Sequence, residues 1–436
     1  MKVAVIGAGW AGCAAALGAC RLGHQVTLFE ANRAAGGRAR RVDVARGHQQ
    51  WALDNGQHIL IGAYSETLKL MASVGIDEHS ALLRMPLALQ FADGTGLRLP
   101  NWPSPLDALI GILGARGWSL RDKWSLLSAA TSWQLRKFAC PAQASVASIC
   151  SSLSPRVMAT LIEPLCVSAL NTPADRASGQ VFLRVMRDAL FSGSGGSNLL
   201  LPLVDLSALM PDAAVAWLEK HGADVRLGSR VQQLQKNGSR WHVATEPVDS
   251  ARVDFESQKT TNSFDSVVLA CPAHTAVKLA QTSGAPCASW LNAAQALTYE
   301  AITTVYAFNR SGPLAKPLIA LPSNSAYPAQ FVFDRSQLGG PPGLLAFVVS
   351  ASSGDAATLT NQVAAQATAQ LGLADLDMLQ TIVEKRATFA CTPGLRRPDQ
   401  FIAPGLLAAG DYIEGPYPAT LEGAVRSGLH AAMLLQ

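Results

Sequence analysis

Three glycines and an acidic residue near the start of the sequence have the spacing of a phosphate- and ribose-binding motif. Gly7, Gly9 and Gly12 form the pattern G-x-G-x-x-G, and Glu30 follows 18 positions after Gly12. In this pattern the first glycine permits a tight turn, the second lets the backbone approach a pyrophosphate, and the third lets a helix pack closely on a strand. The N-terminus of that helix faces the phosphates, and the acid accepts hydrogen bonds from ribose hydroxyls.

The residues around this motif predict the elements that must position it. Residues 3–6 are a short apolar run of the buried parallel-strand type, residues 13–22 are rich in Ala and Leu as in a helix, and residues 25–29 predict a second strand. Residues 3–20 carry no charge, but glycines interrupt them and only Lys2 precedes them, which argues against a signal peptide or a membrane span. Together these features indicate a Rossmann-type dinucleotide site that also involves Trp10, Ala11 and Ala31.

Two further segments place polar groups near the same site. Gly36 and Gly37 predict a turn whose backbone N–H groups approach an anion, and Arg38 adds positive charge there. An exposed basic turn is the alternative. The next segment, residues 54–59, contains Asn55, Gly56, Gln57 and His58. This histidine is either a site residue or a hydrogen-bonded structural histidine.

The C-terminal part of the chain has a matching pair of features. Residues 405–410 predict an apolar strand that ends in Gly410-Asp411, and a terminal helix begins around Glu422, Gly423 and Ala424. Together with the R-x-x-G-G-R run at residues 33–38, these segments resemble the superfamily of FAD-binding amine oxidases and phytoene desaturases. The resemblance implies FAD as the cofactor, held between the two ends of the chain.

The superfamily resemblance also implies a role for each segment. Residues 54–58 would run beside the isoalloxazine ring, and Asp411 would accept a ribityl hydroxyl. The backbone N–H groups of residues 422–425 would point at flavin N1 and O2, where charge gathers in the reduced ring. The backbone near Val231 would meet the adenine.

The fold class that we expect is α/β. We predict a discontinuous Rossmann-type FAD-binding domain from residues 1–75, 205–275 and 400–436, and a mixed α+β substrate-binding domain from residues 76–204 and 276–399. In the first domain, residues 206–221 predict a helix, and residues 223–231 and 263–271 predict strands.

The substrate-binding domain is expected to combine two kinds of structure. Residues 76–204 look largely helical, whereas residues 301–308, 330–333 and 344–349 predict strands.

A closer resemblance is carried by four stretches, which are residues 54–59, 163–173, 177–185 and 385–393. With the motifs at 410–411 and 418–423 they resemble the hydroxysqualene dehydroxylase family over nearly the whole chain. That resemblance implies a bacterial enzyme of hopanoid biosynthesis that converts the C30 alcohol hydroxysqualene to squalene. Reduced flavin would deliver hydride from N5 while the hydroxyl leaves as water.

The implied reaction needs a proton donor, because an allylic hydroxyl leaves poorly until it is protonated. The candidates are His58, Glu163 and Tyr417. Apolar sequence neighbours would raise the pKa of Glu163 and keep it protonated, although a surface position or a pair with an arginine is the alternative. Tyr412 and Tyr417 either line the wall around a developing allylic cation or are packing residues.

Composition narrows the choice of partners. The chain has 49% hydrophobic and 15% charged residues and a net charge of +4, which is too small to indicate nucleic-acid binding. The apolar surplus indicates a lipid-binding cavity or membrane contact as readily as a large Ala-rich core.

The eight cysteines form no C-x-x-C pair and no metal spacing, so we expect no metal and a cytoplasmic location. A single dinucleotide motif predicts no built-in NAD(P)H site to supply electrons.

Peripheral contact with a membrane is expected, because a C30 hydrocarbon dissolves in lipid. Residues 108–113 and 118–133 are the candidate surface, with Trp118, Trp124 and Trp133 suited to an interface. An ordinary pair of core helices is the alternative interpretation.

Three other functions fit parts of the pattern. A phytoene-type desaturase would run in the oxidative direction on a similar substrate, and an amine oxidase would share the cofactor site. A non-catalytic prenyl-chain binder would share the architecture without using flavin. The complete fingerprint, from Gly7 through Glu30 to Asp411 and Glu422, argues against the last. A yellow purified protein would exclude it.

Overall fold

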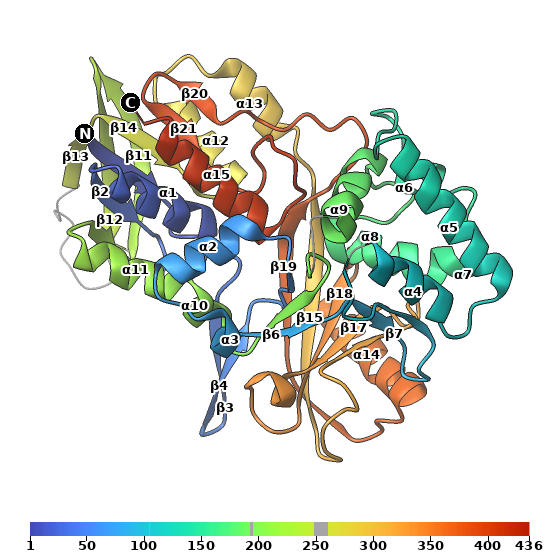
Figure 1. Cartoon of the computed structure of the whole chain (residues 1–436). Coiled ribbons are helices and arrows are strands. Elements are labelled where there is room, and N and C mark those ends of the chain that lie inside the picture. The colour runs from blue at the N-terminus through green and yellow to red at the C-terminus, as the bar shows by residue number, and fades with distance from the viewer. Residues whose placement is uncertain (104, 192–194, 248–259, 436) are drawn as a thin grey trace.

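The first strand, β1 (Lys2–Ile6), lies inside a six-stranded sheet in the order β10-β2-β1-β14-β21-β20 (Figure 1). The computed structural model describes residues 1–103, 105–191, 195–247 and 260–435. The other strands of this sheet are β2 (Gln25–Phe29), β10 (Asp224–Arg226), β14 (Ser266–Leu269), β20 (Phe401–Ala403) and β21 (Leu406–Ala408). All neighbours are parallel except β20, which pairs with β21 in the antiparallel direction. The parallel sheet confirms the predicted α/β class with a Rossmann-type core.

Two helices from opposite ends of the chain pack together beside this sheet (Figure 1). They are α1 (Trp10–Arg21) and α15 (Leu421–Met433). A Cβ at Gly428 would overlap the Ala11 carbonyl oxygen, so the two backbones touch. Strands of the sheet come from each of the three segments assigned to the FAD-binding domain, while the exact division into domains stays a prediction.

Three predicted elements are each divided in two. The helix expected at 206–221 is α10 (Leu206–Leu209) and α11 (Pro211–Lys220), because Pro211 lacks the N–H that would continue the first helix. The strand expected at 223–231 is β10 and β11 (Ser229–Asn237), separated by Gly228 with φ +68°. The strand expected at 263–271 is β13 (Thr260–Phe264) and β14. β13 joins an antiparallel sheet with β11 and β12 (Arg240–Pro247), whereas β14 joins the parallel one.

A five-stranded antiparallel sheet lies below the centre of Figure 1, in the order β16-β17-β18-β15-β19. Its strands are β15 (Tyr299–Asn309), β16 (Leu318–Ala320), β17 (Phe331–Asp334), β18 (Leu344–Ser350) and β19 (Leu376–Phe389). β15 and β18 contain the predicted strands at 301–308 and 344–349, and β17 overlaps the one predicted at 330–333 but begins one residue later. Helix α14 (Ala356–Leu371) buries Leu359 and Val363 against Val305 and Phe347 of the sheet.

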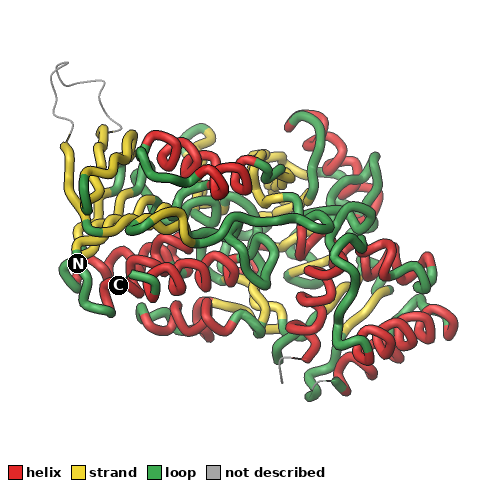
Figure 2. Tube along the Cα trace, turned by 90° about the horizontal axis from the view of Figure 1, so that it is seen from above, coloured by secondary structure: helices red, strands yellow, loops and turns green. Residues whose placement is uncertain are grey.

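Most of the remaining helices form a lobe on the side away from both termini (Figures 1 and 2). They are α4 (Leu106–Gly114), α5 (Leu120–Leu135), α6 (Val146–Ile149), α7 (Pro155–Val157), a π-helical turn (Met158–Ile162), α8 (Glu163–Leu170) and α9 (Gly179–Phe191). Trp118 and Trp133 are buried in this lobe, so the prediction that they face an interface is wrong; Trp124 is exposed. In the described residues no helix is long and apolar enough to cross a membrane.

Short strands and helices connect these layers. Some of the short strands lie within residues 76–204, so that segment is not helical throughout, although the sequence suggested a largely helical one. The small strands are β3 (Arg41–Arg46), β4 (Gln49–Asp54), β5 (Leu60–Ile61), β6 (Leu82–Met85), β7 (Ala88–Gln90), β8 (Gly96–Arg98) and β9 (Leu199–Pro202). The small helices are α2 (Ser65–Ser73), α3 (Glu78–Ala81), α12 (Ala273–Thr282), α13 (Ala288–Gln295) and the 3-10 turn Arg335–Leu338. Strand β9 pairs with both β5 and β6, which fastens the two ends of the helical insertion together.

Candidate cofactor and active site

A side chain would have different structural consequences at the three glycines of the first motif. Gly7 has φ +108°, and a Cβ there would come 2.7 Å from the Ala270 carbonyl oxygen. A Cβ at Gly12 would overlap the carbonyl oxygen of Gly7. Gly9 has an ordinary φ of −73°, and among the described residues a Cβ there would come within 4 Å of the Gly37 Cα alone, at 3.8 Å. The fold itself therefore needs Gly7 and Gly12, whereas Gly9 leaves space that a ligand can use.

A second glycine turn lies directly against the first. The Gly36 N–H donates to the Ala8 carbonyl at 2.8 Å, and a Cβ on Gly37 would come 3.1 Å from the Cα of Gly9. The Trp10 indole N–H donates to the Ala39 carbonyl at 3.2 Å and holds the two turns together. Two adjoining turns of this kind place several backbone N–H groups beside one anion.

Glu30 lies at the end of β2, where its carboxylate is buried. Its oxygens accept the N–H groups of Ala8 and Asn32, both at 2.8 Å. Its backbone carbonyl accepts the Ser229 N–H at 2.8 Å, which brings β11 to the same edge. Val231 follows two residues later, at an irregularity in the pairing of β11 with β12. The acid predicted for the ribose and the backbone predicted for the adenine therefore lie on connected elements.

Arg38 joins four segments that are far apart in the sequence. Its Nη2 lies 2.6 Å from the Asp411 Oδ1, and its Nη1 donates to the Ala387 carbonyl. Asn55 donates from Nδ2 to the Arg38 carbonyl at 3.0 Å and to the Glu384 carboxylate at 3.3 Å. Although burial lowers the pKa of the Arg38 guanidinium, the Asp411 carboxylate raises it above its ordinary value. The structure thus brings together Arg38, Asn55 and Asp411, which the sequence placed at the cofactor.

Two buried polar atoms near this cluster have no hydrogen-bond partner among the described residues. They are the His58 Nδ1 and the Tyr412 hydroxyl. Leaving such a group unsatisfied costs about 1–3 kcal/mol, so a ligand that meets it gains affinity. Burial and then the nearby Arg38 charge lower the pKa of His58 to about 4, and burial raises the pKa of Tyr412 well above its ordinary value. The imidazole is therefore neutral at neutral pH.

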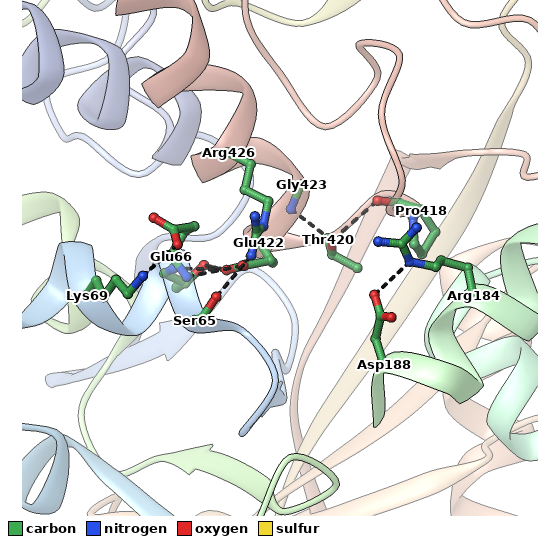
Figure 3. A network of polar contacts seen from close by, with 11 residues as sticks. Ser65, Glu66, Lys69, Arg184, Asp188, Pro418, Thr420, Glu422, Gly423 and Arg426 are labelled. Carbon is green, nitrogen blue, oxygen red and sulfur yellow. Dashed lines mark hydrogen bonds and ion pairs between the residues drawn. The ribbon is translucent and has the colours of Figure 1, made fainter. Parts of the chain in front are cut away.

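Glu422 lies in the first turn of α15 (Figure 3), and it is fully buried. Its carboxylate accepts the N–H and the hydroxyl of Thr67 at 2.9 and 2.6 Å, and the Arg426 Nε at 2.7 Å. These bonds fasten α15 to α2 and occupy the side chain. Thr420 caps the Gly423 N–H at 3.1 Å. The Ala424 N–H also donates to the Thr420 carbonyl, at 3.0 Å. The cofactor interaction predicted for Glu422, Gly423 and Ala424 would therefore rely on the dipole of the helix N-terminus, because the Glu422 carboxylate and the N–H groups of Gly423 and Ala424 have partners within the protein.

Tyr417 lies on the loop before α15, half-buried. The Arg426 guanidinium lies 5.4 Å from the centre of its ring. Burial raises the pKa of the phenol, which keeps it protonated. A cavity of about 520 Å³ is lined by Tyr417 together with Phe138, Arg184, Cys391 and Arg397. Tyr417 therefore has a proton to donate and a space into which it can donate it.

Glu163 has other surroundings. It begins α8, and its Oε1 accepts the Ala174 N–H at 3.3 Å. Burial raises the pKa of this carboxyl, as the apolar neighbours predicted. None of the contacts described for this part of the chain joins Glu163 to His58 or to Tyr417. A second and larger cavity of about 830 Å³, which Trp51 and Phe308 line, includes none of the predicted site residues.

The sequence singled out the segment that begins at Asp54, but it did not indicate the partners of Asp54 or the part played by Tyr306. The Asp54 Oδ1 accepts the Leu206 N–H at 2.8 Å, and burial raises the pKa of its carboxyl to about 6. The Tyr306 hydroxyl donates to the Asp54 carbonyl at 2.7 Å and accepts from the Gln57 Nε2 at 2.8 Å. Gln57, predicted to lie beside the flavin, is therefore oriented by a tyrosine of β15. The β-branched and aromatic residues of β15 predict a strand, but they do not indicate which residue this tyrosine meets.

Comparison with known proteins gives a consistent picture over the full length. A family model described as flavin containing amine oxidoreductase matches residues 11–435. Hydroxysqualene dehydroxylase of Rhodopseudomonas palustris is 27% identical over 455 residues, which cover 99% of this chain and 98% of that protein. The protein of the same name from Zymomonas mobilis is 26% identical over 451 residues, with the same coverage. A zeta-carotene desaturase of Zea mays is 35% identical over 79 residues, or 18% of this chain and 13% of that protein.

Solved structures share the fold at low sequence identity. An oxidoreductase from Methanosarcina mazei superposes with a TM-score of 0.71 at 18% identity, over 99% of this chain and 100% of that one. A double mutant of a putrescine oxidase superposes with a TM-score of 0.70 at 15% identity, over 99% and 98% of the two chains.

Proposed function

The chain belongs to the flavin containing amine oxidoreductase family, and from that premise we propose that it removes the hydroxyl of hydroxysqualene to give squalene. Its cofactor is FAD, and it is an oxidoreductase. The observation that carries the proposal is the similarity to relatives named hydroxysqualene dehydroxylase over 99% of the chain. A hopanoid or related triterpenoid pathway of a bacterium would use the product.

The reaction exchanges one C–O bond for one C–H bond. When bound and reduced, FAD supplies the hydride that replaces the hydroxyl, and a proton completes the departing water. The cofactor residues of this chain would be the glycine turns at Gly9 and Gly37 for the pyrophosphate, Glu30 for the ribose and Asp411 for the ribityl chain. The chain itself must hold the allylic carbon in place, exclude water and donate the proton.

Tyr417 is the proton donor that the geometry favours. It lines a cavity, it is protonated at neutral pH, and the Arg426 guanidinium near its ring would stabilise the phenolate left after donation. His58 is a weaker candidate, because its imidazole carries no extra proton at neutral pH. Glu163 has a raised pKa, but it already caps the turn after α8.

Anaerobic single turnover with the chemically reduced holoenzyme tests the proposal. Hydroxysqualene should reoxidise the flavin and yield squalene without NADPH in the chemical step. Tyr417→Phe should bind FAD normally and slow reoxidation by about 10²–10⁴, the usual contribution of general acid catalysis. Glu163→Gln tests the other acid. Tyr327→Phe, the same change on a loop outside the cavity, should react at the parental rate.

The alternative is a desaturase, which the 79-residue similarity to zeta-carotene desaturase favours. Such an enzyme would act on the hydrocarbon when its flavin is oxidised. If the oxidised protein desaturates an isoprenoid hydrocarbon while the reduced protein leaves hydroxysqualene unchanged, the desaturase assignment replaces the dehydroxylase. If Tyr417→Phe and Glu163→Gln both react at the parental rate, the proton comes from another group.

A further inference from the structure

Helix α4 turns apolar side chains toward solvent. Leu106, Leu109 and Leu113 are exposed, at positions i, i+3 and i+7 of one helical face. The opposite face packs inward, where a Cβ on Gly111 would come 2.5 Å from Leu99 of the lobe. This orientation reverses the usual one, in which the apolar stripe of a helix faces the core.

Helix α5 repeats the arrangement beside it. Leu120, Trp124 and Leu135 are 84%, 73% and 80% exposed, whereas Leu126 and Trp133 on the other side are buried. The Lys123 Nζ donates to the Leu113 carbonyl at 2.6 Å, so the start of α5 lies against the end of α4. With Trp102, these exposed side chains form what we call the α4–α5 surface, made of Trp102, Leu106, Leu109, Leu113, Leu120, Trp124 and Leu135.

The exposed apolar side chains of this surface lie close together along the chain, unlike the single exposed apolar residues that are scattered over most proteins. Of the thirteen large apolar side chains exposed among the described residues, the α4–α5 surface contains seven. Single exposed apolar residues are normal, whereas a contiguous group marks an interaction site. Both helices lie at the right edge of the molecule in Figure 1, away from the FAD-binding sheet.

The segment that carries the surface is rich in basic side chains, although the exposed Asp93 lies just before it. Residues 98–137 contain six basic residues, which are Arg98, Arg116, Arg121, Lys123, Arg136 and Lys137. The same segment has two acids, Asp107 and Asp122, and both are buried. Asp107 accepts the Ala108 N–H at 2.7 Å, and Asp122 forms a capping box with Ser119. The exposed charge of the segment is therefore positive.

We propose that the α4–α5 surface docks on a lipid bilayer that contains anionic lipids. The leucines and the two tryptophans would enter the boundary between headgroups and acyl chains, and the surrounding basic side chains would meet the anionic headgroups. Charge complementarity favours lipid over a second copy of the chain, because a symmetric pair would bring two basic rims together.

The surface also adjoins the cavity of Tyr417. Helix α5 ends at Leu135, and Lys137 and Phe138 then take left-handed conformations with φ of 54° and 57°. Phe138 lines the cavity of about 520 Å³ that Tyr417 also lines. An apolar molecule leaving the bilayer at the end of α5 would thus meet the cavity. This last step depends on the proposed function, whereas the docking surface does not.

Flotation of the purified holoenzyme with lipid vesicles tests the proposal. We expect binding to vesicles of phosphatidylcholine with phosphatidylglycerol, weaker binding to phosphatidylcholine alone, and release by high salt. The double variant L120S/W124S should bind at least about tenfold more weakly, because both apolar anchors are lost. L22S/M433S, which removes two exposed apolar residues outside the surface, should bind like the parent. Retained flavin colour and melting temperature in both variants would show that they fold.

Each outcome of the vesicle assay either supports or overturns the docking of the α4–α5 surface on a bilayer. Equal binding of L120S/W124S and the parent would overturn the proposal, as would the absence of vesicle binding in the parent. A parental dimer that L120S/W124S converts to monomers, without vesicle binding, would show that a second copy covers the surface. Because the assay measures no turnover, its failure is separate from a failure of the dehydroxylation test.

Discussion

Replacing Gly9 with alanine separates cofactor binding from folding. Gly9 is the N-cap of α1 with φ −73° and ψ 179°, a conformation that alanine adopts without strain. The new Cβ would lie 3.8 Å from the Gly37 Cα, which is ordinary van der Waals contact. The slightly poorer cap and the smaller unfolded-state entropy of alanine nearly offset each other, so the apoprotein should change in stability by less than about 1 kcal/mol.

The same methyl group would occupy the space through which a pyrophosphate approaches the turn. Losing one or two N–H bonds to a charged phosphate costs roughly 2–4 kcal/mol, since such bonds contribute about 1.5–3 kcal/mol each. We therefore expect FAD affinity to fall by about 30- to 1000-fold in Gly9→Ala.

Titration of deflavinated protein with FAD, followed by flavin fluorescence, measures this change, and thermal unfolding of the apoproteins supplies the stability comparison. Gly12→Ala is the contrasting variant, because its Cβ would overlap the Gly7 carbonyl and should destabilise the protein even without cofactor. If Gly9→Ala binds FAD within about threefold of the parent, the pyrophosphate does not cross this turn and the motif assignment fails.

Two further predictions concern stability. Glu422→Gln should cost about 1–3 kcal/mol, because the buried Thr67 donors lose a charged acceptor, whereas Arg426, whose side chain is 37% exposed, can turn to water; an unchanged melting temperature would contradict this. His58 has a pKa of about 4 when folded and 6.5 when unfolded, so stability falls as pH drops from 6.5 toward 4. Protonation of the unfolded His58 should destabilise the parent by on the order of 1–2 kcal/mol at pH 5, and His58→Gln should abolish this destabilisation. The melting temperature of the variant should therefore drop less between pH 7 and pH 5 than that of the parent. The raised pKa of Asp54 has the opposite effect, because it increases the stability of the folded state as pH falls. Asp54 is present in both proteins, so its effect cancels in the comparison.

Local chemistry allowed much of the cofactor half to be predicted. The glycine spacing, the two strands and Glu30 depend on neighbours within about one βαβ unit, which a sequence displays directly. The division of the helix at Pro211 follows from the missing N–H and was equally visible in the sequence. The separation of β13 from β14 was not, because only Asp265 lies between the two strands and only the tertiary fold assigns them to different sheets.

The contacts that assemble the site are longer in range. Arg38 and Asp411 are 373 positions apart, and each was predicted to meet the cofactor without any indication that they pair with each other. The fastening of α2 by the Glu422 carboxylate was likewise invisible. The tryptophans of the lobe were different. Trp124 and Trp133 are nine positions apart, about two and a half turns, so their opposite exposure could have been inferred from helix geometry.

The packing of α15 against α1 has a consequence for biosynthesis. The ribosome makes α1 among the first elements and α15 after every other described element, yet the two backbones touch at Gly428 and Ala11. Strand β21, which completes the parallel part of the sheet beside β14, is also made late. The apolar face of α1 therefore cannot pack against α15 until almost the whole chain has been synthesised. During that delay it is exposed to chaperones and to aggregation. In the proposed cofactor site, FAD would meet Asp411 and the helix N-terminus near Glu422 only after translation has passed the start of α15, because these residues do not exist before that point.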